Sequence, residues 1–111
     1  MMNKRITIHT ENSIYVLDPD DVLYCQCHDI STTIHLKNNE TLEISKKMDA
    51  VEKLLEGNGF ISPHHAFLVN RNYILRVDMT DDYTLVLANQ VKIPIEGKTQ
   101  AEILEFIKID N

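Results

Sequence analysis

The sequence predicts a mainly β fold: an elongated antiparallel β-sheet domain with one inserted helix at about 46–56 and one C-terminal helix at about 99–108. Two observations support this prediction. Most segments are short and alternate apolar with polar side chains, as half-buried strands do. Two segments instead repeat apolar residues at helical spacing. A chain of 111 residues can bury a core of its own, so we expect a single domain over 1–111.

The first part of the chain is predicted to form strands joined by turns. Residues 5–9 place Ile6 and Ile8 on one face, and a second alternating segment follows at 13–17. The sequence DPDD at 18–21 indicates a turn, because Asp and Pro favour turn conformations. Three further strands are expected, the last two joined as a hairpin, at 22–28, 32–36 and 41–44.

The inserted helix is predicted from apolar residues at helical spacing, namely Met48, Val51, Leu54 and Leu55. Ser45 can cap its start, since a serine hydroxyl accepts from the free N–H groups of a first turn. Gly57 can end it, because glycine adopts the left-handed conformation that often follows a helix.

The second part of the chain returns to strand patterns. Between Phe60–Ile61 and the apolar piece 67–69, the segment 62–66 is expected to be irregular or a single helical turn beginning with Pro63. Three strands should follow, at 73–79, 83–87 and 91–95. Thr99 and Glu102 have the spacing of a capping box before the final helix.

The net charge of the whole chain is unfavourable for nucleic-acid binding. Eleven Lys and Arg against 17 Asp and Glu give a net charge of −6, so any nucleic-acid contact must use a local patch or loops. The segment 60–76 contains two Arg and two His and no acidic residue. The alternative interpretation is that His64 and His65 are only a surface turn between core residues. No membrane-spanning run or signal peptide is visible, so we expect a cytoplasmic location.

The cysteines and nearby histidines are a candidate zinc site that we disfavour. On a strand, Cys25 and Cys27 would share one face with Leu23, while His28 would point to the other face. Free cysteine is among the most frequently buried residue types. We therefore expect two unpaired, buried or half-buried thiols, no metal site and no cofactor.

Catalytic motifs are not apparent in the sequence. Neither cysteine is followed by a glycine-rich elbow or a helix start, and no phosphate-binding glycine loop occurs. The acidic turn at 18–21 lacks the glycine and the terminal glutamate of a calcium-binding loop. We expect this turn to be solvated and the protein not to be an enzyme.

The segment 60–74 reads FISPHHAFLVNRNYI and resembles the hallmark of the LytTR DNA-binding domain family, F-I-R-I-H-x-S-Y-L-V-N-x-x-Y-I. DVLY at 21–24 is similar to the D-I-L-Y strand of that family, and IPI at 93–95 is similar to its I-P-V-S ending. The helix expected at 46–56 is similar to the helix that precedes the F-I-R segment in that family. The resemblance covers about residues 4–108, with its motifs in the family's order.

The resemblance implies sequence-specific double-stranded DNA binding by a bacterial transcriptional regulator, as the output domain of a response regulator in a two-component system. It implies that direct repeats in promoters are read by three loops, at 28–32, 62–66 and 96–100. Imidazole, hydroxyl and amide groups suit base edges, and cations suit phosphates. The DNA-binding residues implied are His28, Ser31, Thr32, Ser62, His64, His65, Arg71, Lys98 and Gln100.

The sequence departs from the family pattern at the implied loops. Ser62 stands where the family has Arg, Ala66 where it has Ser, and Glu96 and Gly97 where Ser and Arg-rich residues are usual. Fewer phosphate contacts mean fewer released counterions, so we expect binding weaker than is usual for the family. The alternative function is a protein-interaction module on the same fold, with weakened or lost DNA binding. Such a module would bind a partner protein or pair with a DNA-competent copy. For either function, a receiver domain or a second copy of the chain is an expected partner.

Overall fold

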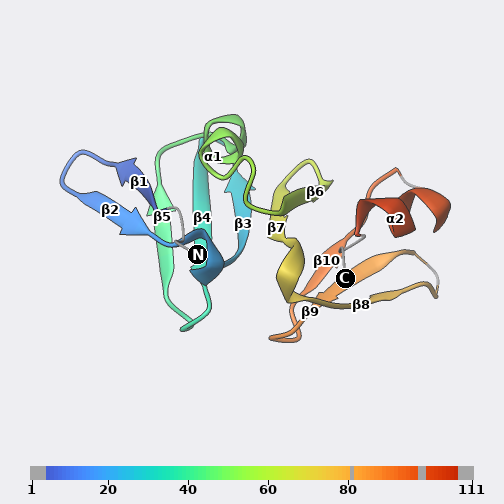
Figure 1. Cartoon of the computed structure of the whole chain (residues 1–111). Helices are drawn as coiled ribbons and strands as arrows, with labels where there is room; N and C mark the ends of the chain where they lie inside the picture. The colour runs from blue at the N-terminus through green and yellow to red at the C-terminus, as the bar shows by residue number, and fades with distance from the viewer. Residues whose placement is uncertain (1–4, 81, 98–99, 108–111) are drawn as a thin grey trace.

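The computed structural model describes residues 5–80, 82–97 and 100–107, and these form a mainly β domain (Figure 1). The described residues contain three antiparallel sheets, two α-helices and two 3-10 helices. The domain is elongated, with extents of 44 × 36 × 23 Å. The predicted fold class is therefore confirmed.

The elements follow the predicted order. Their bounds are β1 Ile6–His9, β2 Ile14–Leu17, the 3-10 helix η1 Pro19–Asp21, β3 Val22–His28, β4 Ser31–Leu36, β5 Thr41–Ile44, α1 Met48–Leu54, β6 Phe60–His64, β7 Phe67–Asn70, the 3-10 helix η2 Arg71–Tyr73, β8 Ile74–Asp78, β9 Thr84–Leu87, β10 Lys92–Pro94 and α2 Gln100–Phe106.

The largest sheet has five strands in the order β5-β4-β3-β7-β6 and packs on both faces. Cys25 pairs with Leu68, and both belong to one hydrophobic core. Their neighbours Tyr24 and Val69, which also pair, belong to a second core. This division follows from strand geometry, because successive side chains point to opposite faces.

The first core lies under α1 and the β1–β2 hairpin. Met48, Val51 and Leu55 supply the helix side, and Ile6 and Ile8 supply the hairpin side. A fully buried aliphatic side chain contributes about 1.5–3 kcal/mol, so these contacts hold both elements on the sheet.

The second core joins the five-stranded sheet to the smaller sheet β10-β9-β8. Leu85, Leu87 and Ile93 of the smaller sheet are fully buried in it, beside Tyr24 and Val69. The two sheets consequently lie side by side, with α2 alongside the strands of the smaller one (Figure 1).

Two details differ from the sequence-based expectations, and a third lies outside the described residues. Helix α1 begins at Met48 with Lys47 at the N-cap and no side-chain capping bond, so the predicted Ser45 cap is wrong. The segment with Pro63 is extended within β6, not a helical turn. Because β6 is an edge strand, the missing N–H of Pro63 is tolerated there. The predicted capping residue Thr99 lies outside the described residues.

The cysteines behave largely as expected. Cys25 is fully buried, Cys27 is half-buried, and both thiols are free. Burial raises the pKa of the Cys25 thiol to about 12, so this group is unreactive at neutral pH. Leu23, however, packs in the second core and not beside Cys25. The register shift between Val22 and Tyr24 reverses the side on which Leu23 points.

Candidate nucleic-acid interface

Backbone hydrogen bonds bring the three expected loops together. The N–H of Cys27, at the end of β3, donates to the carbonyl of Ala66 at 2.8 Å. The N–H of Glu96 donates to the carbonyl of Pro63, also at 2.8 Å. The β6–β7 turn at residues 64–66 therefore lies between the β3–β4 turn at 28–31 and residues 96–97, the described part of the third expected loop. We call these three segments the loop surface.

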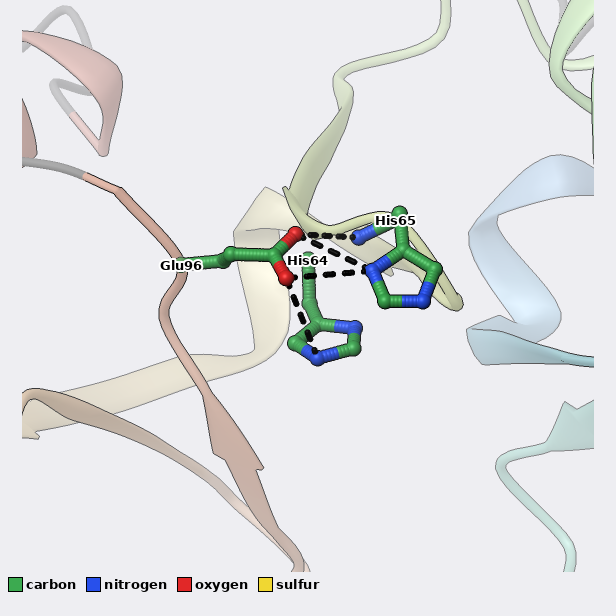
Figure 2. A group of neighbouring side chains, drawn as sticks. All are labelled: His64, His65 and Glu96. Atoms are coloured by element: carbon green, nitrogen blue, oxygen red, sulfur yellow. Dashed lines mark hydrogen bonds and ion pairs between the residues drawn. The ribbon is translucent and has the colours of Figure 1, made fainter.

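Glu96 binds the two histidines of the β6–β7 turn (Figure 2). Both of its carboxylate oxygens lie 3.1 Å from Nδ1 of His65, and one also accepts from the His65 backbone N–H at 3.2 Å. The other oxygen lies 3.8 Å from Nε2 of His64. The two imidazole rings stack, with 4.3 Å between centroids.

The carboxylate is ionised in this setting. The hydrogen bonds from the His65 side chain and backbone lower the pKa of Glu96, and the charges of His65 and His64 lower it further. His65 and Glu96 are largely exposed, whereas His64 is mostly covered. The centre of the loop surface thus carries a negative charge beside the histidines expected to meet DNA.

The serine hydroxyls of the loop surface already have partners within the protein. Ser62 Oγ lies within donor distance of the carbonyls of His64 and Phe67, at 3.1 and 3.2 Å. Ser31 Oγ donates to the His28 carbonyl at 3.3 Å and lies 3.5 Å from a Glu43 carboxylate oxygen. A hydroxyl oxygen with its hydrogen committed can still accept, so these groups suit base or backbone donors better than phosphates.

Thr32 was expected in the loop surface, and the structure contradicts that expectation. Its side chain is fully buried, and its hydroxyl donates to the carbonyl of Lys46 at 2.7 Å. The hydroxyl therefore fixes the segment before α1 to the start of β4 and does not reach solvent.

Replacing Thr32 with valine is expected to lower the free energy of unfolding by about 1–1.5 kcal/mol, because the Lys46 carbonyl loses its donor at nearly unchanged volume. DNA affinity should stay the same. Urea denaturation and a DNA titration measure the two effects. Thr41→Val, at an exposed position of β5, is the matched control and should change stability by less than about 0.5 kcal/mol. If Thr32→Val weakens DNA binding, Thr32 does contribute to the DNA interface.

Arg71 lies away from the loop surface. It follows Asn70, and its N–H donates to the Gly59 carbonyl, whereas the β6–β7 turn lies at the other end of β7. The four residues of β7 lie between Ala66 of the turn and Arg71, which separates the two positions by about 16 Å along the strand. Lys98 lies outside the described residues, and Gln100 is described only as the first residue of α2.

Sequence reasoning missed the role of Glu96 as the partner of both histidines. The two segments are 31 residues apart, and no local pattern joins them. It also missed Lys47, an exposed cation next to the Lys46 carbonyl that holds Thr32. The available signal was the pair of lysines at 46–47, one residue beyond the strand paired with β4.

A family model described as the LytTr DNA-binding domain matches residues 12–108. The chain belongs to the LytTr DNA-binding domain family. This membership supports DNA binding and transcription regulation as its class of function, and the family is not a class of enzymes. No helix among the described residues has both the length and the apolar character needed to cross a bilayer.

Curated relatives are bacterial sensory transduction proteins. The LytTr chain is 23% identical over 107 residues to the sensory transduction protein LytT of Bacillus subtilis (strain 168), across 95% of this chain and 44% of that protein. It is 25% identical over 95 residues to the sensory transduction protein LytR of Staphylococcus saprophyticus, across 84% of this chain and 37% of that protein. The chain thus spans less than half the length of these relatives.

A solved structure shares the fold. It is described as the LytTr DNA-binding domain of a putative methyl-accepting/DNA response regulator from Bacillus cereus. The TM-score is 0.68 at 22% identity, and the match covers 95% of this chain and 94% of that one. The fold expected from the sequence resemblance is therefore confirmed.

Proposed function

We propose that this chain binds double-stranded DNA sequence-specifically through the loop surface, as the output domain of a bacterial response regulator. The observation that carries the proposal is the pair of backbone hydrogen bonds, Cys27 to Ala66 and Glu96 to Pro63, which makes one surface from three segments. Because the three turns are neighbours, one DNA duplex can contact all of them at the same time. If the turns lay far apart, the duplex could contact only one of them.

The exposed groups of this surface suit base edges. His28 and His65 are exposed, and each imidazole can donate or accept a hydrogen bond in the major groove. Ile30 is 66% exposed at the tip of the β3–β4 turn, where its side chain suits the methyl group of thymine. Lys47 lies outside these three segments, but it follows Lys46, whose carbonyl binds Thr32 at the start of β4, and we propose it as a cation for a neighbouring phosphate.

The proposed target is a direct repeat bound by two copies of the chain. The relatives are more than twice as long as the part matched, and we propose that a receiver domain occupies the remaining length of the regulator to which this chain corresponds. Phosphorylation of such a domain would bring two copies together on the repeat.

The test is a selection of binding sites from random duplexes, followed by titration at low salt. The wild-type chain should prefer the selected duplex at least about tenfold over bulk DNA, a difference of about 1.4 kcal/mol. His65→Ala should remove most of this preference. His9→Ala, at an exposed position of β1, is the matched control and should retain it. No preference in the wild type, or an equal effect of both variants, would refute the proposal.

A protein contact is the second candidate function. Ile14 and Val16 are 61% and 55% exposed on β2, which pairs only with β1 among the described strands. An edge strand with apolar side chains can add a further strand from a partner. Binding that survives high salt and excludes DNA would favour this role.

A further inference from the structure

Three potential metal ligands converge where the β6–β7 turn meets Glu96 (Figure 2). One ligand atom from each of His64, His65 and Glu96 can be chosen so that all three lie within 4.8 Å of one another. We propose that these residues form a binding site for a divalent transition-metal ion, with zinc as the representative ion. Two imidazoles and one carboxylate are the donor set of open zinc sites, in which water takes the fourth position.

The distances are close to those that zinc requires. Tetrahedral bonds of about 2.0–2.1 Å place ligand atoms about 3.3 Å apart. Nδ1 of His65 already lies 3.1 Å from the Glu96 oxygens, and Nε2 of His64 lies 3.8 Å from one of them. The three ligand atoms lie within 4.8 Å of one another, so side-chain rotations must bring them closer together to bind zinc. The side chains of His65 and Glu96 are 76% and 51% exposed, which leaves them room to rotate.

Metal binding would rearrange the protons of both rings. On His65, the proton that Nδ1 shares with Glu96 must leave that atom, and the neutral ring can carry it on Nε2. On His64, Nδ1 accepts the Ala66 N–H at 3.1 Å, so the neutral ring carries its proton on Nε2. Coordination by Nε2 moves that proton to Nδ1 and breaks the Ala66 bond. We therefore expect His64 to be the weakest of the three ligands.

The ion would also reverse the charge of the loop surface. With neutral imidazoles the cluster carries the −1 of Glu96, and a bound divalent ion changes this to +1. The open coordination position could then accept a phosphate oxygen. This consequence for DNA rests on the proposed function, whereas the metal site itself does not.

Isothermal titration calorimetry tests the metal site. The full chain is first freed of metal with a chelator and is then titrated with zinc chloride. Cobalt chloride supplies a second readout, because tetrahedral Co²⁺ has strong visible absorption. We expect one saturable site, weakened at least about tenfold by His65→Ala and by Glu96→Gln, less by His64→Ala, and unchanged by His9→Ala. Circular dichroism confirms that each variant is folded. An absence of saturable binding in the wild type would overturn the proposal, and so would zinc affinities of Glu96→Gln and His65→Ala that equal that of the wild type.

Titration with DNA at low salt, with zinc or with EDTA, tests the consequence separately. Zinc should tighten binding by the wild type about tenfold and leave Glu96→Gln unchanged. If zinc binds but DNA affinity is zero in both buffers, the proposed function fails and the metal site stands. If DNA binds but calorimetry shows no zinc site, the metal site fails and the proposed function stands.

Discussion

Replacing Asn70 with alanine is expected to lower the free energy of unfolding by about 3 kcal/mol. Asn70 is 1% exposed, and its Nδ2 donates to the carbonyl of Val22 at 3.0 Å and lies 3.4 Å from that of Pro19. Its Oδ1 accepts the N–H of Asn72 at 3.0 Å. Alanine would remove both sets of bonds and take a donor from the buried Val22 carbonyl, a loss that costs about 1–3 kcal/mol. The Pro19 carbonyl would keep only the backbone N–H of Val22 as its donor.

Urea denaturation measures this loss. Asn72→Ala is the matched control, because Asn72 is exposed and only its backbone N–H is used in the bond with Asn70. The control should change stability by less than about 0.5 kcal/mol. A loss below about 1 kcal/mol for Asn70→Ala would show that solvent can replace these bonds.

Replacing Glu96 with lysine is expected to tighten DNA binding about tenfold in the presence of EDTA. The change removes the carboxylate that pairs with His65 and adds a cation at the centre of the loop surface. One added phosphate contact also makes the salt dependence steeper, by about 0.9 in the slope of log affinity against log salt. Fluorescence titrations at several salt concentrations measure both effects.

Glu40→Lys is the control for net charge. It makes the same change at the β4–β5 turn, at the opposite end of β4 from the β3–β4 turn, about 20 Å away along the strand. This separation exceeds the screening length of about 10 Å at 0.1 M salt. If Glu40→Lys strengthens binding as much as Glu96→Lys, the loop surface is not where DNA binds.

Local sequence patterns predicted most elements because each depends on neighbouring residues. Alternation at Ile6 and Ile8 placed β1 against the core, and the spacing of Met48 and Val51 placed α1. Helix α2 lies within the range 99–108 that was expected, at Gln100–Phe106. The family resemblance, carried by the segment 60–74, is confirmed by the family match over 12–108.

The sequence alone therefore determined the fold class, the order of the elements and the family. Only the tertiary structure decided which side chains share a surface. It buried Thr32, placed Arg71 at the far end of β7 and joined Glu96 to His65 across 31 residues of chain. The periodicity of apolar residues along a sequence indicates which face of a helix or strand is apolar. Contacts between distant segments depend instead on strand register and on bulges such as the one at Val22–Tyr24.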